Sequence, residues 1–210
     1  MPANSTIIPL TAQQVPTILS YDLTTEKYII GDEARKLGLK GWTNAFNFKP
    51  VIGDGDAAFS KTNKYWMAPR VEYDEKTKRT THDPRMHTAK DVTIYFLREL
   101  LKDVKVPSEI IIGEPAERDT AWKDNFRRHM REIIGEVCGI RPQFLAEPFA
   151  VFQYYRHYER VFSAETKSET VLIIDIGGGT FNSCIIGTTE EGALSRGGPK
   201  SVPYGLQAEL

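Results

Sequence analysis

The residues around Asp175 have the types and spacing needed to bind a nucleotide phosphate. Asp175 follows the apolar run 171–174, and a glycine-rich stretch begins two residues after it: Gly177, Gly178, Gly179 and Thr180. Because glycine has no β-carbon and adopts positive φ angles readily, phosphate oxygens can approach the amides of such a turn closely. A neighbouring carboxylate can hold a divalent cation or orient a water molecule. The sequence therefore indicates a candidate phosphate and metal site.

The same stretch is also compatible with a purely structural hairpin turn. The largely apolar runs 171–174 and 181–186 predict a strand on each side of the glycines, and glycine-rich turns commonly join such strands. The P-loop is excluded, since no Gly-Lys-Ser or Gly-Lys-Thr follows the glycines, and no Gly-x-Gly-x-x-Gly opens a helix here. Residues elsewhere in the chain must decide between the two interpretations.

Two further sets of residues contain metal-ligand types without the required pattern. Asp54 and Asp56 resemble a fragment of a calcium loop that lacks its remaining ligands, which favours a surface turn. The histidines include no helical pair with a suitable acid between them, so ordinary surface or helix positions are favoured over metal or triad roles. These residues are His82, His87, His129 and His157.

Composition limits the possible partners. The chain has 210 residues, of which 40% are hydrophobic, enough for the core of one large or two small domains. Its 27 basic and 28 acidic residues give a net charge of −1, so no excess of charge favours nucleic acid or an anionic membrane. Cys138 and Cys184 are far apart and suit buried free thiols in a reducing compartment. The sequence shows no apolar run of membrane-spanning length and no signal-peptide pattern, and we expect a cytoplasmic protein.

In the N-terminal half, the pattern of apolar residues predicts a hairpin and a short helix. Strands are expected at 15–21 and 26–30, around a turn. A helix over 33–37 is expected to end at Gly38, because glycine is favoured just past helix ends. The charged stretch 74–78 predicts the turn of an exposed hairpin.

A second series of helices and strands follows. Thr88 and Asp91 match an N-cap and third helical position, and they predict a helix that continues to about residue 103. A strand at 108–113 leads into a helix from about Asp119 to Gly139, and a strand at 142–146 leads into another helix. The face of the Asp119 helix opposite its apolar residues is basic: Lys123, Arg127, Arg128 and Arg131.

Taken in order, these pieces resemble the nucleotide-binding domain of the heat-shock protein 70 (DnaK-type) chaperones, members of the actin-like ATPase superfamily. They are Glu-Pro-Ala at 114–116, an amphipathic helix, Ala-Glu-Pro at 146–148, and Asp-Ile-Gly-Gly-Gly-Thr-Phe at 175–181. Upstream, 30–34 and 46–53 follow the family's early segments in the same order. The resemblance covers nearly all of the chain, and its specificity comes from the joint order and spacing.

The resemblance implies roles for particular residues. The amides of Gly177, Gly178 and Gly179, together with Thr180, would bind the outer phosphates of ATP or ADP. Asp175 would hold magnesium through water and position the attacking water, and Glu147 would join the magnesium–water shell. Lys49 would place a positive charge on the γ-phosphate, where transition-state charge needs stabilising.

Two departures from the family pattern bear on activity. Asn182 stands where the family usually has an acid, and asparagine keeps an oxygen ligand but loses the charge. Relative to the family, the chain starts after the first phosphate loop, Asp-x-Gly-Thr-Thr, and stops before the adenosine motif. We therefore expect a domain truncated at both ends, and the sequence leaves open whether it hydrolyses ATP alone.

The implied fold is α/β, built from ribonuclease-H-like lobes in which a mixed sheet is flanked by helices. Residues 1–162 would form a nearly complete first lobe with a hairpin insertion near 43–87, followed by a connector at 163–169. Residues 170–210 would begin the second lobe with the phosphate-binding hairpin. The implied function is that of a chaperone that couples ATP hydrolysis to protein folding, with client proteins and co-chaperones as partners.

Alternative functions remain open at this point. The chain could be a non-enzymatic interaction or regulatory module derived from an actin-like ATPase, with the basic helix face as a possible contact surface. It could also belong to another branch of the superfamily, the filament-forming ATPases or the sugar kinases.

Overall fold

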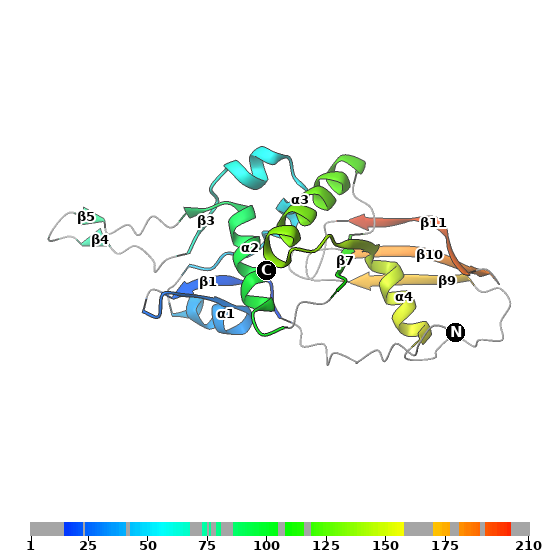
Figure 1. Ribbon diagram of the computed structural model, residues 1–210, viewed down its shortest axis with the longest axis horizontal. Helices are drawn as coiled ribbons and strands as arrows, with labels where there is room; N and C mark the ends of the chain where they lie inside the picture. Colours follow the sequence, from blue (N-terminus) through cyan, green and yellow to red (C-terminus); the bar gives the residue numbers. More distant parts are fainter. Residues whose placement is uncertain are drawn as a thin grey trace. The chain divides into compact units, whose positions relative to one another are not determined.

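The computed structural model describes residues 15–22, 24–40, 43–67, 73–74, 76, 79–80, 86–104, 108–115, 119–157, 170–176, 181–189 and 192–202. These residues form a mixed α/β fold of small sheets and helices (Figure 1), which confirms the predicted α/β class. The chain divides into two compact units. The first comprises Met1–Val51 and Ala57–Lys105, and the second comprises Ile52–Asp56 and Val106–Leu210. The predicted connector at 163–169 lies outside the described residues.

The first unit is built on the predicted N-terminal hairpin. Strands β1 (Leu19–Asp22) and β2 (Lys27–Ile30) pair antiparallel, and helices α1 (Gly31–Leu39) and α2 (Ala89–Leu101) pack against them. Strand β1 starts four residues later than expected from the apolar pattern at 15–21. The core of this unit is apolar and aromatic: Leu19, Tyr21, Ala45, Phe48, Met67, Val92 and Phe96.

Short segments connect α1 to α2. They comprise a 3-10 helix, η1 (Pro50–Gly53), a π-helix, η2 (Ala57–Lys61), and four short strands: β3 (Tyr65–Trp66), β4 (Tyr73–Asp74), β5 (Arg79–Thr80) and β6 (Met86–His87). Strands β3 and β6 pair antiparallel, as do β4 and β5. The β4–β5 pair confirms the hairpin predicted around the charged stretch 74–78.

Helix α1 does not end at Gly38 as predicted. It continues to Leu39, and its C-cap is Lys40. A β-carbon at Gly38 would lie 2.2 Å from Nδ2 of Asn44, so this glycine allows a close approach of the Asn44 side chain. The absence of a side chain at Gly38 therefore serves packing, whereas the sequence pattern had suggested a helix end.

The N-terminus of α2 carries the predicted capping box. The Asp91 amide donates to Oγ1 of Thr88 at 3.2 Å, and the Thr88 amide donates to Oδ2 of Asp91 at 2.9 Å. Each side chain thus satisfies an amide that the helix itself leaves without an acceptor.

Replacing Thr88 with alanine is expected to lower the free energy of unfolding by about 1 kcal/mol, because one side of the capping box is lost. Denaturant unfolding measures this difference. Thr120→Ala is the control, since Thr120 is exposed at the first position of a helix that Asp119 caps. Equal effects of the two substitutions would contradict the prediction.

The second unit begins with a parallel β-α-β arrangement. Strand β7 (Ile111–Glu114) leads through helix α3 (Thr120–Cys138) to strand β8 (Gln143–Ala146), which pairs parallel with β7. Helix α3 begins at the predicted cap Asp119, whose side chain accepts from the Trp122 amide, and it ends at Gly139, whose φ of 70° is left-handed. Helix α4 (Glu147–His157) follows β8 directly, also as predicted.

A three-stranded antiparallel sheet completes the second unit. Strands β9 (Thr170–Ile176), β10 (Phe181–Thr189) and β11 (Gly192–Val202) follow the order β11-β10-β9, as the sheet in Figure 1 shows. Helix α4 packs on β9 and β10 through Phe152, around which lie Ile173, Cys184 and Ile186. The sequence predicted β9 and β10 but not β11.

Among the described residues, no helix is both long and apolar enough to cross a bilayer.

Candidate functional site

Two glutamates stand at the same edge of the parallel pair β7–β8. The register places Glu114, the last residue of β7, opposite Ala146, and Glu147 follows as the first residue of α4. A β-carbon at Gly113 would lie 3.3 Å from Cγ of Glu147, so the glycine leaves room for this side chain beside β7. The carboxyl ends of parallel strands are where α/β folds commonly bind ligands.

Glu114 forms a buried ion pair with Arg127. Its side chain is 4% exposed and accepts from Arg127 through two bonds, Nε to Oε2 at 2.6 Å and Nη2 to Oε1 at 2.5 Å. Lys123 adds a contact of 3.8 Å between Nζ and Oε1. The hydrogen bonds to Glu114 raise the pKa of Arg127. Glu114 is therefore a structural carboxylate, and Glu147 is the glutamate at this edge that the resemblance assigns to magnesium.

Asp175 lies near the end of β9, which pairs antiparallel with β10, so the two predicted strands are present. Its partner across the β9–β10 ladder is Asn182, the position at which the family usually has an acid. The predicted phosphate-binding residues Gly177, Gly178, Gly179 and Thr180 lie outside the described residues. Their role and that of Asp175 in metal binding stay predictions.

Helix α4 carries Glu147, one of the two candidate metal residues, and contacts β9, which carries the other, Asp175. It starts at Glu147 at the end of β8 and contacts β7, β8, β9 and β10. Phe152, five residues after Glu147, is fully buried against Ile173, two residues before Asp175. The second unit thus brings the helix of Glu147 and the strand of Asp175 into one packed core.

Lys49 belongs to the other unit. It is exposed and directly precedes η1. The structure therefore places Glu147 and Asp175 in the second unit and Lys49 in the first.

The basic residues of α3 make contacts inside the second unit. Lys123 and Arg127 contact Glu114, and Arg128 donates from Nη2 to Oδ1 of Asp56 at 2.7 Å. The guanidinium carbon of Arg131 lies 5.2 Å from the centre of the Phe144 ring. These internal contacts reduce the charge that the face could offer to a partner, and they weaken it as a contact surface.

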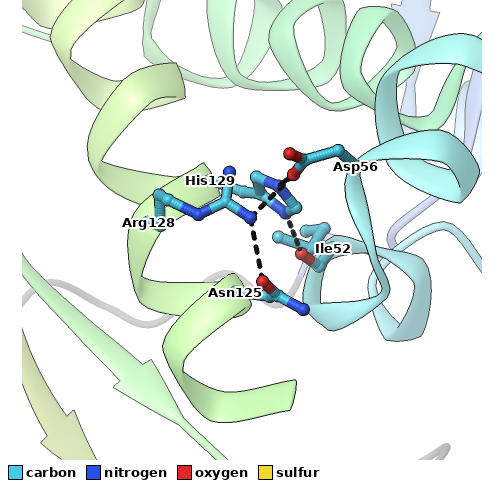
Figure 2. Close-up of polar contacts among 5 residues, drawn as sticks. All are labelled: Ile52, Asp56, Asn125, Arg128 and His129. Carbon is cyan, nitrogen blue, oxygen red and sulfur yellow. Dashed lines mark hydrogen bonds and ion pairs between the residues drawn. The ribbon is translucent and has the colours of Figure 1, made fainter. Parts of the chain in front are cut away.

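A buried histidine forms a polar cluster that sequence reasoning missed. His129 of α3 is 2% exposed, and its two ring nitrogens lie 2.6 Å from the Ile52 carbonyl oxygen and 2.9 Å from Oδ1 of Asp56 (Figure 2). The available signal was helical spacing, because His129 follows the buried Phe126 by three residues and precedes the buried Ile133 by four. Asp56, expected to be part of a surface turn, is 60% exposed, and its side chain also binds α3.

Among the described residues, no group of three or more His, Cys, Asp or Glu side chains could hold a metal ion. Magnesium needs fewer protein ligands than this, since it is commonly held by one or two carboxylates with phosphate oxygens and water. Comparison with known proteins adds no family: no protein-family model matches the chain, and no curated protein matches it significantly.

Proposed function

We propose that this chain is the ATP-binding part of a heat-shock-protein-70-like chaperone, with an actin-like ATPase fold and a cytoplasmic location. The observation that carries the proposal is the packing of α4, the helix that begins at Glu147, on β9, the strand that contains Asp175. The resemblance assigns magnesium to these two acids.

In this proposal each residue has a distinct task. The amides of the 177–180 turn hold the outer phosphates, and Asp175 and Glu147 bind magnesium through water molecules. Bound magnesium would neutralise charge on the phosphate oxygens. Lys49 stabilises the negative charge that develops on the γ-phosphate during transfer. Client proteins and co-chaperones would be the partners of such a chaperone.

Calorimetric titration of magnesium-ATP tests the proposal. We expect measurable binding by the 210-residue chain, and a loss of affinity of roughly tenfold or more for Asp175→Ala and Lys49→Ala, because each removes a charged contact. Glu109→Gln and Lys40→Ala are matched controls, since both residues are exposed and lie outside the candidate site. Absence of binding heat in the wild-type chain would overturn the proposal and favour a non-enzymatic module.

Glu147 offers a more specific test because Gly113 borders it. Gly113→Val is expected to displace the Glu147 side chain and to weaken ATP binding in the presence of magnesium more than in its absence. Gly135→Ala is the control, because a β-carbon there meets no atom within 4 Å. An equal loss of ATP affinity with and without magnesium would contradict the assignment of Glu147 to the metal.

A further inference from the structure

Lys49 lies in a tight turn that begins at a buried side chain. The amide of Val51 donates to the carbonyl oxygen of Phe48 at 3.1 Å, and this bond closes a turn over the two residues between them. Phe48 is 1% exposed and belongs to the core of the first unit. The residue after the lysine is Pro50, whose ring fixes its φ angle. The backbone on the N-terminal side of Lys49 is therefore held in place, although the lysine itself is exposed.

The chain that follows this turn is held in the second unit. The 3-10 helix η1 starts at Pro50, and its last residues, Ile52 and Gly53, belong to the same unit as α3. Ile52 is 4% exposed, and its carbonyl oxygen lies 2.6 Å from Nδ1 of His129. Lys49 precedes Ile52 by three residues, so their α-carbons are at most about 11 Å apart. An anchor at Ile52 therefore restricts where the lysine can lie.

Helix α3 also packs on the backbone of the segment 52–56. A β-carbon at Gly53 would lie 1.9 Å from Cε2 of Trp122, so the glycine backbone lies directly against the indole ring. Trp122 is 7% exposed and stacks on Phe126 with ring centres 5.3 Å apart. Because both rings are packed, the indole cannot easily move away from the segment.

The end of the same segment is bound by polar side chains of α3. Arg128 donates from Nη2 to Oδ1 of Asp56 at 2.7 Å, and Nε2 of His129 lies 2.9 Å from the same oxygen. Figure 2 shows both side chains facing the part of the chain that carries Asp56. Helix α3 thus holds the segment 52–56 at its start, at Gly53 and at its end.

We propose that α3 positions Lys49 for the γ-phosphate by holding the segment 52–56, with Asp56 as a positioning residue. The inference rests on the proposed function, in which Lys49 meets that phosphate. With Phe48 fixed on one side and the segment fixed on the other, the lysine backbone has few conformations to lose when nucleotide binds. Asp56 acts through the chain and not by touching the nucleotide.

Comparison of ATP and ADP binding tests the inference, because ADP lacks the γ-phosphate. In the full chain with magnesium, we expect Asp56→Ala to weaken ATP binding roughly tenfold and to leave ADP binding unchanged. Removal of an acid would by charge alone favour ATP, the more negative nucleotide, so charge alone would produce the opposite result. In the Lys49→Ala background, Asp56→Ala should cause no further loss, because the residue that it positions is gone.

Three further variants identify the anchor as the cause. Asp56→Asn keeps an oxygen that can accept from Arg128, and it should retain most of the ATP affinity. Asp54→Ala is the matched control, since it removes the same charge from the same segment, and it should leave the ratio of ATP to ADP affinity unchanged. Gly53→Ala disturbs the anchor at a second point, because its β-carbon would meet the Trp122 ring, and it should lower ATP affinity relative to ADP affinity.

Amide exchange tests the anchor without nucleotide. We expect Asp56→Ala to raise exchange of the Val51 amide, corrected for its intrinsic rate, roughly threefold or more, and Asp54→Ala to leave it unchanged. Unchanged Val51 exchange in folded Asp56→Ala would overturn the inference. So would a ratio of ATP to ADP affinity that falls in Lys49→Ala but not in Asp56→Ala. A wild-type chain that binds no ATP would overturn the proposed function and with it the role of Lys49, whereas Val51 exchange reports independently whether α3 holds the turn.

Discussion

Replacing Phe152 with alanine is expected to lower the free energy of unfolding by about 3–5 kcal/mol. The side chain is fully buried between α4 and the sheet, where it contacts Ile173, Cys184 and Ile186. Its removal leaves a cavity that these strand residues cannot fill without moving the backbone. Chemical denaturation with circular dichroism measures the loss.

The position of Phe152 makes this substitution a test of the candidate site as well. If the α4 core holds Glu147 and Asp175 in position, ATP affinity should fall even under conditions in which Phe152→Ala remains folded. Ile174→Ala is the control, because Ile174 lies on β9 but is 54% exposed, and it should cost less than about 1 kcal/mol. Unchanged ATP affinity in folded Phe152→Ala would show that this core does not position the site.

The second large effect is expected at the buried ion pair of α3. Arg127→Met should lower the free energy of unfolding by roughly 3 kcal/mol, because it leaves the buried Glu114 carboxylate with Lys123 as its remaining cation. Urea unfolding measures this loss.

Two comparisons separate the ion pair from loss of packing. The double variant Arg127→Met with Glu114→Leu should recover much of the stability, because no buried charge remains. Arg35→Met breaks the exposed pair with Asp32, whose side chains are 55% and 66% exposed, and should change stability by less than about 1 kcal/mol. An equal loss in Arg127→Met and Arg35→Met would contradict the buried-pair account.

Local sequence signals were sufficient for the helices and for most strands. Thr88 with Asp91, Asp119 and Gly139 predicted helix ends correctly, because each acts on backbone groups within a few residues of itself. The strands β9 and β10 were also predictable, since two apolar runs flank the glycines. The prediction that α1 ends at Gly38 was wrong, because glycine is favoured both at helix ends and where a side chain such as Asn44 packs closely on the backbone.

The side chains that bind across elements could not be assigned in this way. The sequence contains two similar Glu-Pro pieces, and only the structure shows that Glu114 binds Arg127 whereas Glu147 lies beside Gly113. Of the four basic residues on this face of α3, three bind Glu114 or Asp56. Such pairings depend on the distance between residues far apart in the chain, which local pattern does not encode.

The sequence by itself determined the α/β class, the order of elements and the candidate residues Asp175, Glu147 and Lys49, because composition, periodicity and motif order are properties of the chain. Only the tertiary structure decided that α4, which begins at Glu147, packs on β9, which contains Asp175. It also decided that His129 lies within hydrogen-bonding distance of Asp56, 73 positions away in the sequence. The physical reason is that burial changes what a side chain does. A histidine that would be an ordinary helix residue in water becomes, once it is buried beside Ile52 and Asp56, a polar link between two segments of the chain.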